Sequence, residues 1–566
     1  MAKHAVWLKI LLVSAFVLLT NFGFVGRIEL LLAQERPVTL VGFLGVWVLS
    51  VAAIFAAALQ PRWSWRLAWA VILAVSTACS VGYYSISGSE VTVFGVVSLW
   101  NARQEAGRAA DFYGSHLLAS AGITLVAGLL IIGFPAPLRS ARLRLWMSRL
   151  AVLPVLPLAG IALIVAMKSG GGQQALPKQF TPLSVTAFAA GKIATLENQV
   201  RGRVAWTPDP QARVKNILLL VDESIRADYL DFSPGNPVTP NLPSLEANFV
   251  NFGPAASGGN CSHYSNFILR SGARRNDLAK SANTSPLIWS YAKKAGYRTV
   301  FIDAQGAIVK DPGRLTNFMT LSETREIDRF VSLNYVSPDQ ADFELLKIVA
   351  EELKGDQPVF IYANKNGAHF PYDATYPGNQ AKFGPTMIES GSGDTRHRIA
   401  SYDNAIAWSV DRFFSRFFTD IGLANLAMVY TSDHGQSLDR GRLTHCTIDN
   451  PDPREGLVPL LAYASDPALR SRLEAGARAG RGRASHFTII PGVLEMMGYR
   501  ASDIAGYYGE SLFTAPMGPP AFTSGDIFGL FSKEVHWHPV DLAADYREPE
   551  SFAVKPHIGP VAHVTQ

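Results

Sequence analysis

The chain has few cysteines, and its C-terminal two-thirds lack any long apolar run. Only 3 of the 566 residues are cysteines, too few for the disulfide framework that stabilises small secreted domains. Beyond residue 168, no apolar stretch approaches the length needed to cross a membrane. A cleaved signal peptide is not expected, because Arg27 and Glu29 follow the first apolar run where a small-residue cleavage site would stand.

Acidic residues are also scarce in the first part of the chain. Residues 1–168 contain 13 Lys and Arg but only 5 Asp and Glu, whereas the remainder contains 38 basic and 41 acidic residues. The basic character of the chain therefore belongs to its apolar part. The remainder lacks the positive charge that nucleic-acid binding requires, so no nucleic-acid partner is expected.

Five apolar stretches predict a membrane domain over residues 1–168, because each is long enough, or nearly so, to cross a bilayer. If the N-terminus is cytoplasmic, the inside segments carry eight Lys and Arg and the outside segments five, which is the usual bias. Five crossings then place the rest of the chain outside the cytoplasm. The predicted spans are 10–26, 38–59, 67–86, 115–134 and 149–167.

The remainder is too long for a tail and predicts a second domain. Residues 169–214, rich in Gly and Pro, are expected to form a linker, residues 215–515 an α/β domain, and residues 516–566 a tail packed on it. Within the α/β domain, apolar strand-like runs alternate with helical patterns, which indicates a mostly parallel sheet with helices on both faces. The expected strands are 216–221, 299–302, 358–362 and 427–431, and the expected helices are 287–295 and 402–418.

Polar fragments follow these strands, at the sheet edge where such folds bind ligands. Glu223 follows the first strand and is a candidate metal ligand, and Arg226 beside it could contact phosphate or pair with an acid. Ser262 begins a helix after a Gly-rich turn, where a hydroxyl can act as a nucleophile or simply cap the helix. After the third strand, His369 could bind metal or phosphate, or pack in the core, and Lys365 could neutralise phosphate.

The fourth strand ends in Asp433 and His434, and His445 follows eleven residues later. One carboxylate with two imidazoles suits zinc better than magnesium, because imidazole favours the softer ion. Cys261 and Cys446 lie in the outside domain, where two thiols could pair or remain free. The sequence leaves that pairing open.

The motifs that carry a family resemblance occur in order along the chain. They are Val221-Asp222-Glu223-Ser224-Ile225-Arg226-Ala227, Gly367-Ala368-His369-Phe370-Pro371, Tyr402-Asp403-Asn404-Ala405, Ser432-Asp433-His434-Gly435-Gln436-Ser437 and His445. On the basis of these motifs, the chain resembles the alkaline phosphatase and sulfatase superfamily. With the five predicted spans ahead of it, it resembles the bacterial inner-membrane phosphoethanolamine transferases that modify lipid A.

The resemblance implies a role for each candidate residue. The family spacing points to Ser262 as the nucleophile, because Ser265, Leu269 and Gly272 then stand where the family has its serine, apolar residue and glycine. Glu223, Ser262, Asp433 and His434 would hold one Zn²⁺, in preference to Mn²⁺. His369 and His445 would act in catalysis and bind phosphate or a second zinc. Lys365, Arg226 and Asn404 would contribute to phosphate binding.

The chain departs from the family patterns in three respects. The transferases normally use threonine where this chain has Ser262. The sulfatase signature needs proline and arginine where this chain has Tyr264 and Asn266, so a formylglycine sulfatase is not expected. The transferases also usually carry several disulfides in this domain, and this chain can form at most one there.

The function implied is transfer of phosphoethanolamine from phosphatidylethanolamine to lipid A or another envelope glycolipid or glycan, through a phospho-serine intermediate. The enzyme would be a monomer in the bacterial inner membrane with a periplasmic catalytic domain. Two alternatives stay open: a phosphoglycerol transferase to periplasmic glucans or another envelope polymer, and a catalytically silent membrane sensor. The acceptor pocket is expected from loop 87–114, the linker and the loops near 310–340 and 375–397.

Overall fold

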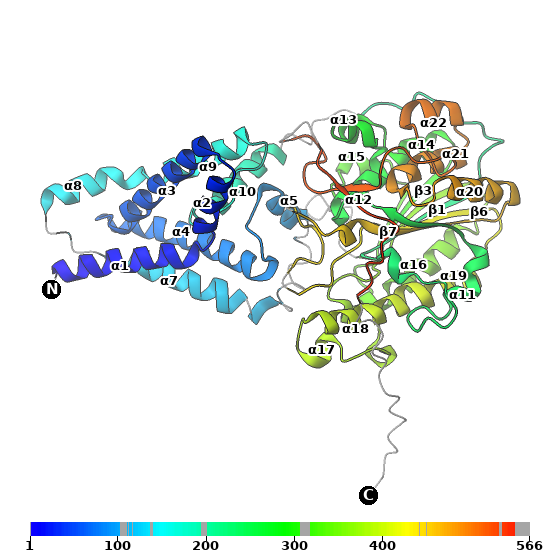
Figure 1. Ribbon diagram of the computed structural model, residues 1–566. Coiled ribbons are helices and arrows are strands. Elements are labelled where there is room, and N and C mark those ends of the chain that lie inside the picture. Colours follow the sequence, from blue (N-terminus) through cyan, green and yellow to red (C-terminus); the bar gives the residue numbers. More distant parts are fainter. Residues whose placement is uncertain are drawn as a thin grey trace, which may run out of the picture. The chain divides into compact units, whose positions relative to one another are not determined.

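The structure is a computed structural model that divides into two compact units. The first contains essentially residues 1–198 and the second most of the remaining residues. Figure 1 shows a helical unit and a unit built around a sheet. The structure describes residues 2–101, 113–115, 117–135, 140–193, 201–305, 317–440, 442–448, 450–530 and 535–548, with the single positions 103, 110 and 138.

The first unit is built of helices. Four helical stretches are long and apolar enough to cross a membrane: 37–58, 63–87, 113–133 and 141–167. The prediction of a multi-pass helical domain is confirmed. Its helices are α1 (Ala2–Thr20), α2 (Phe24–Ala33), α3 (Pro37–Ala58), α4 (Trp63–Ser87), α5 (Val93–Asn101), α7 (Ile123–Gly133), α8 (Ala141–Arg149), α9 (Val155–Met167) and α10 (Thr181–Ile193).

The first predicted span, 10–26, is not one straight helix. The chain bends by 58° between α1 and α2, and the two together form a fifth candidate span. At the bend, the Asn21 side chain donates to Gln179 Oε1 at 3.1 Å and accepts from the Lys178 backbone N–H at 2.8 Å. These polar contacts stabilise a helix break that apolar periodicity alone does not reveal.

The second unit is organised around an eight-stranded sheet with the order β4-β3-β5-β1-β6-β7-β2-β8. Only β7 runs against the others, pairing antiparallel with both β6 and β2. The predicted mostly parallel sheet is therefore confirmed. The strands are β1 (Asn216–Asp222), β2 (Val250–Ala256), β3 (Arg298–Asp303), β4 (Arg329–Ser332), β5 (Val359–Asn364), β6 (Leu426–Ser432), β7 (Leu457–Ala464) and β8 (Ala484–Ser485).

Helices cover both faces of this sheet (Figure 1). On one face, Trp289 of α14 and Val493 of α21 belong to the same core as Ile217 and Leu219 of β1. On the other face, α19 packs Phe414 against Tyr430 of β6. The main helices are α12 (Ser262–Ser271), α14 (Ile288–Lys294), α16 (Pro338–Glu352), α18 (Thr395–Ile406), α19 (Phe413–Asp420), α20 (Pro467–Ala479), α21 (Ile489–Met496) and α22 (Ala501–Tyr508).

The described part of the tail forms a small ribbon. Strand β9 (Ala521–Thr523) pairs antiparallel with β10 (Trp537–Pro539). Trp537 packs on Phe487, and His538 Nε2 lies 2.9 Å from the Ser524 hydroxyl. Residues 549–566 lie outside the described part of the chain.

Candidate metal centre and nucleophile

The carboxyl ends of β1 and β6 bring three candidate ligands together. The two strands are parallel neighbours, with Asp222 in register with Ser432, so the next residue of each chain segment enters the same site. Ligand atoms of Glu223, Asp433 and His434 all lie within 4.8 Å of one another. All three side chains are buried, and this spacing suits coordination of a single metal ion.

Ser262 joins this cluster from the first residue of α12. Its hydroxyl donates to Glu223 Oε2 at 3.1 Å and lies 3.1 Å from His434 Nε2. The residue is half-buried at the N-terminus of a ten-residue helix, whose dipole favours an incoming anion. The predicted nucleophile and the three predicted ligands therefore meet at one point.

The charges at this point fit a divalent cation. Burial raises the pKa of Asp433 well above its usual range, and the nearby Glu223 carboxylate raises it further. Burial also opposes ionisation of Glu223, but the hydrogen bond and charge of His434 hold its pKa well below the usual range. Two buried carboxylates this close are costly unless a cation neutralises them. Carboxylate, imidazole and hydroxyl donors together suit Zn²⁺.

Neighbouring groups orient the ligands. The side chain of Gln305 donates to Glu223 Oε2 at 2.8 Å, and Asn266 donates to Asp433 Oδ2 at 3.3 Å. His434 Nδ1 lies 2.7 Å from the Gly435 carbonyl oxygen. A proton on Nδ1 donates to that carbonyl, so Nε2 is the ring nitrogen that faces the cluster and would bind a metal ion. Sequence reasoning missed Gln305, although this residue lies two positions beyond the end of β3, at the same sheet edge.

Imidazoles border the cluster, including both that the sequence predicted. The ring of His445 stacks on that of His434, with centroids 4.3 Å apart. Burial, and then the charge of His434, hold the pKa of His445 well below its usual range, so this ring is neutral. The Ala368 backbone N–H donates to the Glu223 carbonyl oxygen at 3.0 Å, which places the next residue, His369, beside the same site.

A further imidazole at the site, His263, was not predicted. It is buried next to Ser262, and its ring packs between Tyr264 and Phe318. Burial, and then the charge of His434, lower the pKa of His263 to about 3. Its position directly after the nucleophile is the signal that could have identified it.

Lys365 does not belong to the cluster, contrary to its predicted phosphate-binding role. It is fully buried, and its Nζ contacts Asp222 Oδ2 and the Ser409 carbonyl oxygen, each at 2.5 Å. Its charge therefore neutralises the carboxylate that ends β1. Because that pair is shielded from solvent, Lys365 stabilises the strand end.

Arg226 and Asn404 also serve the fold. Arg226 is buried and pairs with Asp228 and with Glu548, 2.6 Å away, so it holds the tail. Asn404 Oδ1 accepts from the backbone N–H groups of Lys382 at 2.7 Å and Phe383 at 3.0 Å, which ties a loop to α18. Both side chains make these contacts in place of the phosphate contact that was predicted for each, and that role stays a prediction.

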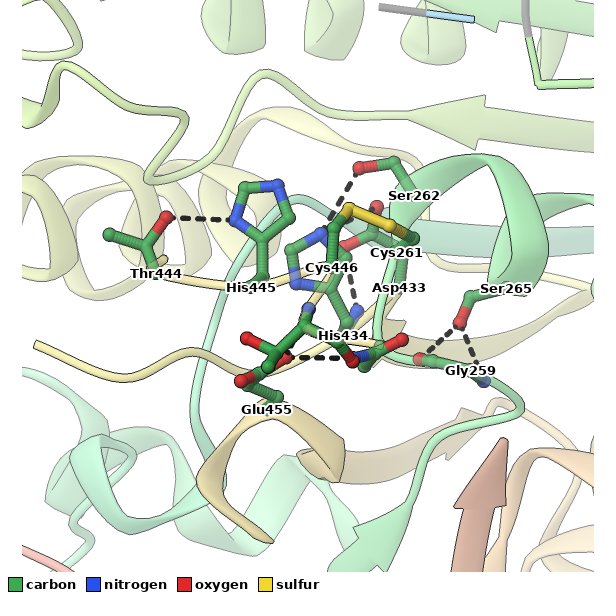
Figure 2. Close-up of a disulfide and its surroundings, with 12 residues drawn as sticks. Gly259, Cys261, Ser262, Ser265, Asp433, His434, Thr444, His445, Cys446 and Glu455 are labelled. Atoms are coloured by element: carbon green, nitrogen blue, oxygen red, sulfur yellow. Dashed lines mark hydrogen bonds and ion pairs between the residues drawn. A yellow bond between two sulfur atoms is a disulfide. The ribbon is translucent and has the colours of Figure 1, made fainter. Parts of the chain in front are cut away.

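The structure joins Cys261 to Cys446 in a disulfide, the pairing that the sequence left open. Their Cα atoms are 4.8 Å apart, and the residues are 185 positions apart in sequence. Figure 2 shows the disulfide beside Ser262 and the stacked rings of His434 and His445. Of the loops predicted to form the acceptor pocket, residues 104–109 and 306–316 lie outside the described part of the chain.

Comparisons with known proteins agree with this geometry. A family model described as Sulfatase matches residues 215–499. The chain is 32% identical over 130 residues to the Kdo(2)-lipid A phosphoethanolamine 7''-transferase of Salmonella typhimurium, a match that covers 23% of each chain. The chain thus spans only about a quarter of the length of the curated relatives it matches.

Two solved structures are similar to this chain to different extents. The integral membrane lipooligosaccharide phosphoethanolamine transferase A (EptA) of Neisseria meningitidis is 17% identical, with a TM-score of 0.61, and the match covers 89% of this chain and 99% of that one. The likeness therefore extends over both units. The C-terminal periplasmic domain of EcEptC from Escherichia coli, solved in complex with Zn, is 18% identical and covers 58% of this chain and 94% of that one, with a TM-score of 0.45.

Proposed function

Because the chain belongs to the sulfatase family, whose model matches residues 215–499, we propose that it is a phosphoethanolamine transferase of the cell envelope. It takes the group from phosphatidylethanolamine and transfers it to lipid A or another envelope glycolipid or glycan. The observation that carries the proposal is the Ser262 hydroxyl, 3.1 Å from both Glu223 Oε2 and His434 Nε2. A metal centre with its own nucleophile suits transfer by a covalent intermediate better than direct hydrolysis.

The residues of the proposed metal site are either metal ligands or groups that hold those ligands in place. Glu223, Asp433 and His434 would hold one zinc ion, with the Ser262 hydroxyl as a further ligand. When bound, zinc favours ionisation of that hydroxyl and stabilises negative charge on the phosphoryl oxygens. Asn266 and Gln305 keep the two carboxylates in place.

The reaction has two balanced halves. In the first, Ser262 Oγ gives up its proton and forms a bond to phosphorus, the bond from phosphorus to the diacylglycerol oxygen breaks, and that oxygen takes up a proton. The phosphoethanolamine group is then esterified to Ser262. In the second, an acceptor hydroxyl, which gives up its proton, or an acceptor phosphate oxygen attacks the same phosphorus, and Ser262 Oγ leaves and takes up a proton. His369, whose chain neighbour Ala368 donates to the Glu223 carbonyl oxygen, would protonate the leaving oxygen, and the neutral ring of His445 would contact the phosphoryl group.

The helical unit would keep the catalytic domain at the membrane that contains its donor. The donor is a membrane lipid, and the N-terminal helices include four long and apolar enough to cross a bilayer. Anchoring the catalytic domain to the same membrane raises the effective concentration of donor and acceptor. The excess of Lys and Arg in the predicted inside segments favours a catalytic domain on the periplasmic side.

Mass spectrometry of envelope lipids and glycans tests this function. Cells that express the chain are compared with cells that lack it and with cells that express the Ser262→Ala variant. We expect a component whose mass rises by one phosphoethanolamine group only when Ser262 is intact. A phosphoglycerol increment would instead assign the chain to transfer from phosphatidylglycerol. An unchanged envelope at normal expression would favour a catalytically silent protein.

A further inference from the structure

The loop that presents His445 has little secondary structure to hold it. Between the end of β6 at Ser432 and the turn that begins at Pro453, the described residues form no helix or strand. Within the loop, the Ser437 backbone N–H donates to the Thr444 carbonyl oxygen at 2.7 Å. The ring of His445 nevertheless lies at a defined place, stacked on His434. The Thr444 hydroxyl of the same loop lies 3.0 Å from His445 Nδ1 (Figure 2), and contacts from outside the loop hold the segment around this ring.

The contacts from outside the loop are made largely by the segment that precedes the nucleophile. The Cys446 backbone N–H donates to the Asn260 carbonyl oxygen at 2.8 Å, and Asn260 Nδ2 donates to the Thr447 carbonyl oxygen at 2.7 Å. Glu455 accepts from Asn260 Nδ2 at 2.8 Å and from the Thr447 N–H at 3.1 Å. The disulfide between Cys446 and Cys261 adds a covalent link to these hydrogen bonds (Figure 2).

Each cysteine of the disulfide is the direct chain neighbour of a site residue. Cys261 immediately precedes Ser262 and is the residue that flanks α12 at its N-terminus. Cys446 immediately follows His445. The disulfide therefore joins the direct chain neighbours of the nucleophile and of the imidazole, across 185 residues of sequence. Hydrogen bonds alone leave a surface loop free to open locally, whereas a covalent bond does not.

We propose that the Cys261–Cys446 disulfide is a positioning brace that holds His445 against the Ser262 centre. The proposal rests on the proposed function, because it assigns His445 a part in phosphoryl transfer. Breaking the brace leaves Glu223, Asp433 and His434 in place, since these ligands follow strand ends. It frees the His445 loop, and an imidazole displaced from the phosphoryl group slows the chemical step without weakening substrate binding.

The test uses the full-length chain in detergent, before and after treatment with a phosphine reductant. The phosphine takes an oxygen atom from water and becomes its oxide, while the two sulfur atoms each gain a hydrogen. Thiol titration checks the step: one thiol, Cys79, is present before reduction, and all 3 cysteines react in the unfolded protein afterwards. We expect kcat to fall on the order of 100-fold, with KM and bound zinc nearly unchanged. Reoxidation should restore the rate.

Variants separate the brace from general stability. Cys261→Ala, Cys446→Ala and the double variant should lose the same activity, because each breaks one shared bond. All three should be insensitive to the phosphine. Leu473→Ala, in the core on α20, lowers Tm without touching the loop and should keep its kcat at a temperature where it is folded. If the cysteine variants do not fold, the kcat of the folded wild-type chain before and after reduction tests the proposal.

The proposal fails if the reduced chain, with 3 thiols counted, transfers phosphoethanolamine at the oxidised rate. It also fails if activity and bound zinc fall together, because the disulfide would then maintain the ligands and not His445. Failure of the proposed function has a different signature: the oxidised wild-type chain would show no transfer at all, while its thiol counts would be unaffected.

Discussion

Replacing Ser262 with alanine is expected to lower the rate of phosphoethanolamine transfer by at least about 10⁴-fold, the scale of loss seen when a catalytic nucleophile is removed. The Ser262 hydroxyl lies 3.1 Å from both Glu223 Oε2 and His434 Nε2, and alanine places no nucleophile at this point. Rates are measured with headgroup-labelled phosphatidylethanolamine and the purified chain in detergent.

The fold should survive this change. Ser262 is half-buried and its hydroxyl contacts only the site among the hydrogen bonds described for it, so we expect the free energy of unfolding to change by less than about 1 kcal/mol.

Ser265→Ala is the matched control one turn along the same helix. The Ser265 hydroxyl bonds to the backbone of Gly259, through its carbonyl oxygen at 2.7 Å and its N–H at 3.0 Å. Losing these bonds should cost about 1–2 kcal/mol of stability while transfer continues. If Ser262→Ala were active and Ser265→Ala inactive, the nucleophile would be assigned to the wrong residue.

Removing a metal ligand is expected to have the second largest effect. Asp433→Ala and His434→Ala each delete one of three donors that lie within 4.8 Å of one another. Zinc affinity should fall by more than about 100-fold, beyond what is typical when only a residue that supports a ligand is changed. Elemental analysis of the purified chain should therefore find little zinc, and transfer should be lost with it.

A histidine outside the cluster provides the control for these variants. His538 lies on β10 and bonds to Ser524 at 2.9 Å, away from the ligands. His538→Ala should keep its zinc and its activity. Full zinc occupancy in both Asp433→Ala and His434→Ala would remove these residues from the metal site.

The sequence predicts the central strands well because they are buried on both faces. The run from Ala427 to Thr431 is apolar throughout and lies within β6, and the polar residues that follow it mark the sheet edge. The reversed strand β7 was not predicted, because an antiparallel neighbour has the same apolar composition as a parallel one. The bend at Asn21 escaped prediction for a similar reason: its partner Gln179 is 158 residues away.

The same reasoning explains which site residues could be predicted. Glu223, Asp433 and His434 follow strand ends, so local pattern and motif locate them. Lys365 follows a strand end as well, but its role depends on Asp222, a partner 143 residues away. The pairing of Cys261 with Cys446 depends on a distance between loops that no local pattern encodes.

The most direct test of the central claim is mass spectrometry of the peptide that contains Ser262, after the chain is mixed with phosphatidylethanolamine in the absence of an acceptor. The account predicts one phosphoethanolamine group on Ser262, which disappears when an envelope glycolipid acceptor is added and appears on that acceptor. Transfer to the acceptor at a full rate while Ser262 stays unmodified, or modification of a different residue, would contradict it.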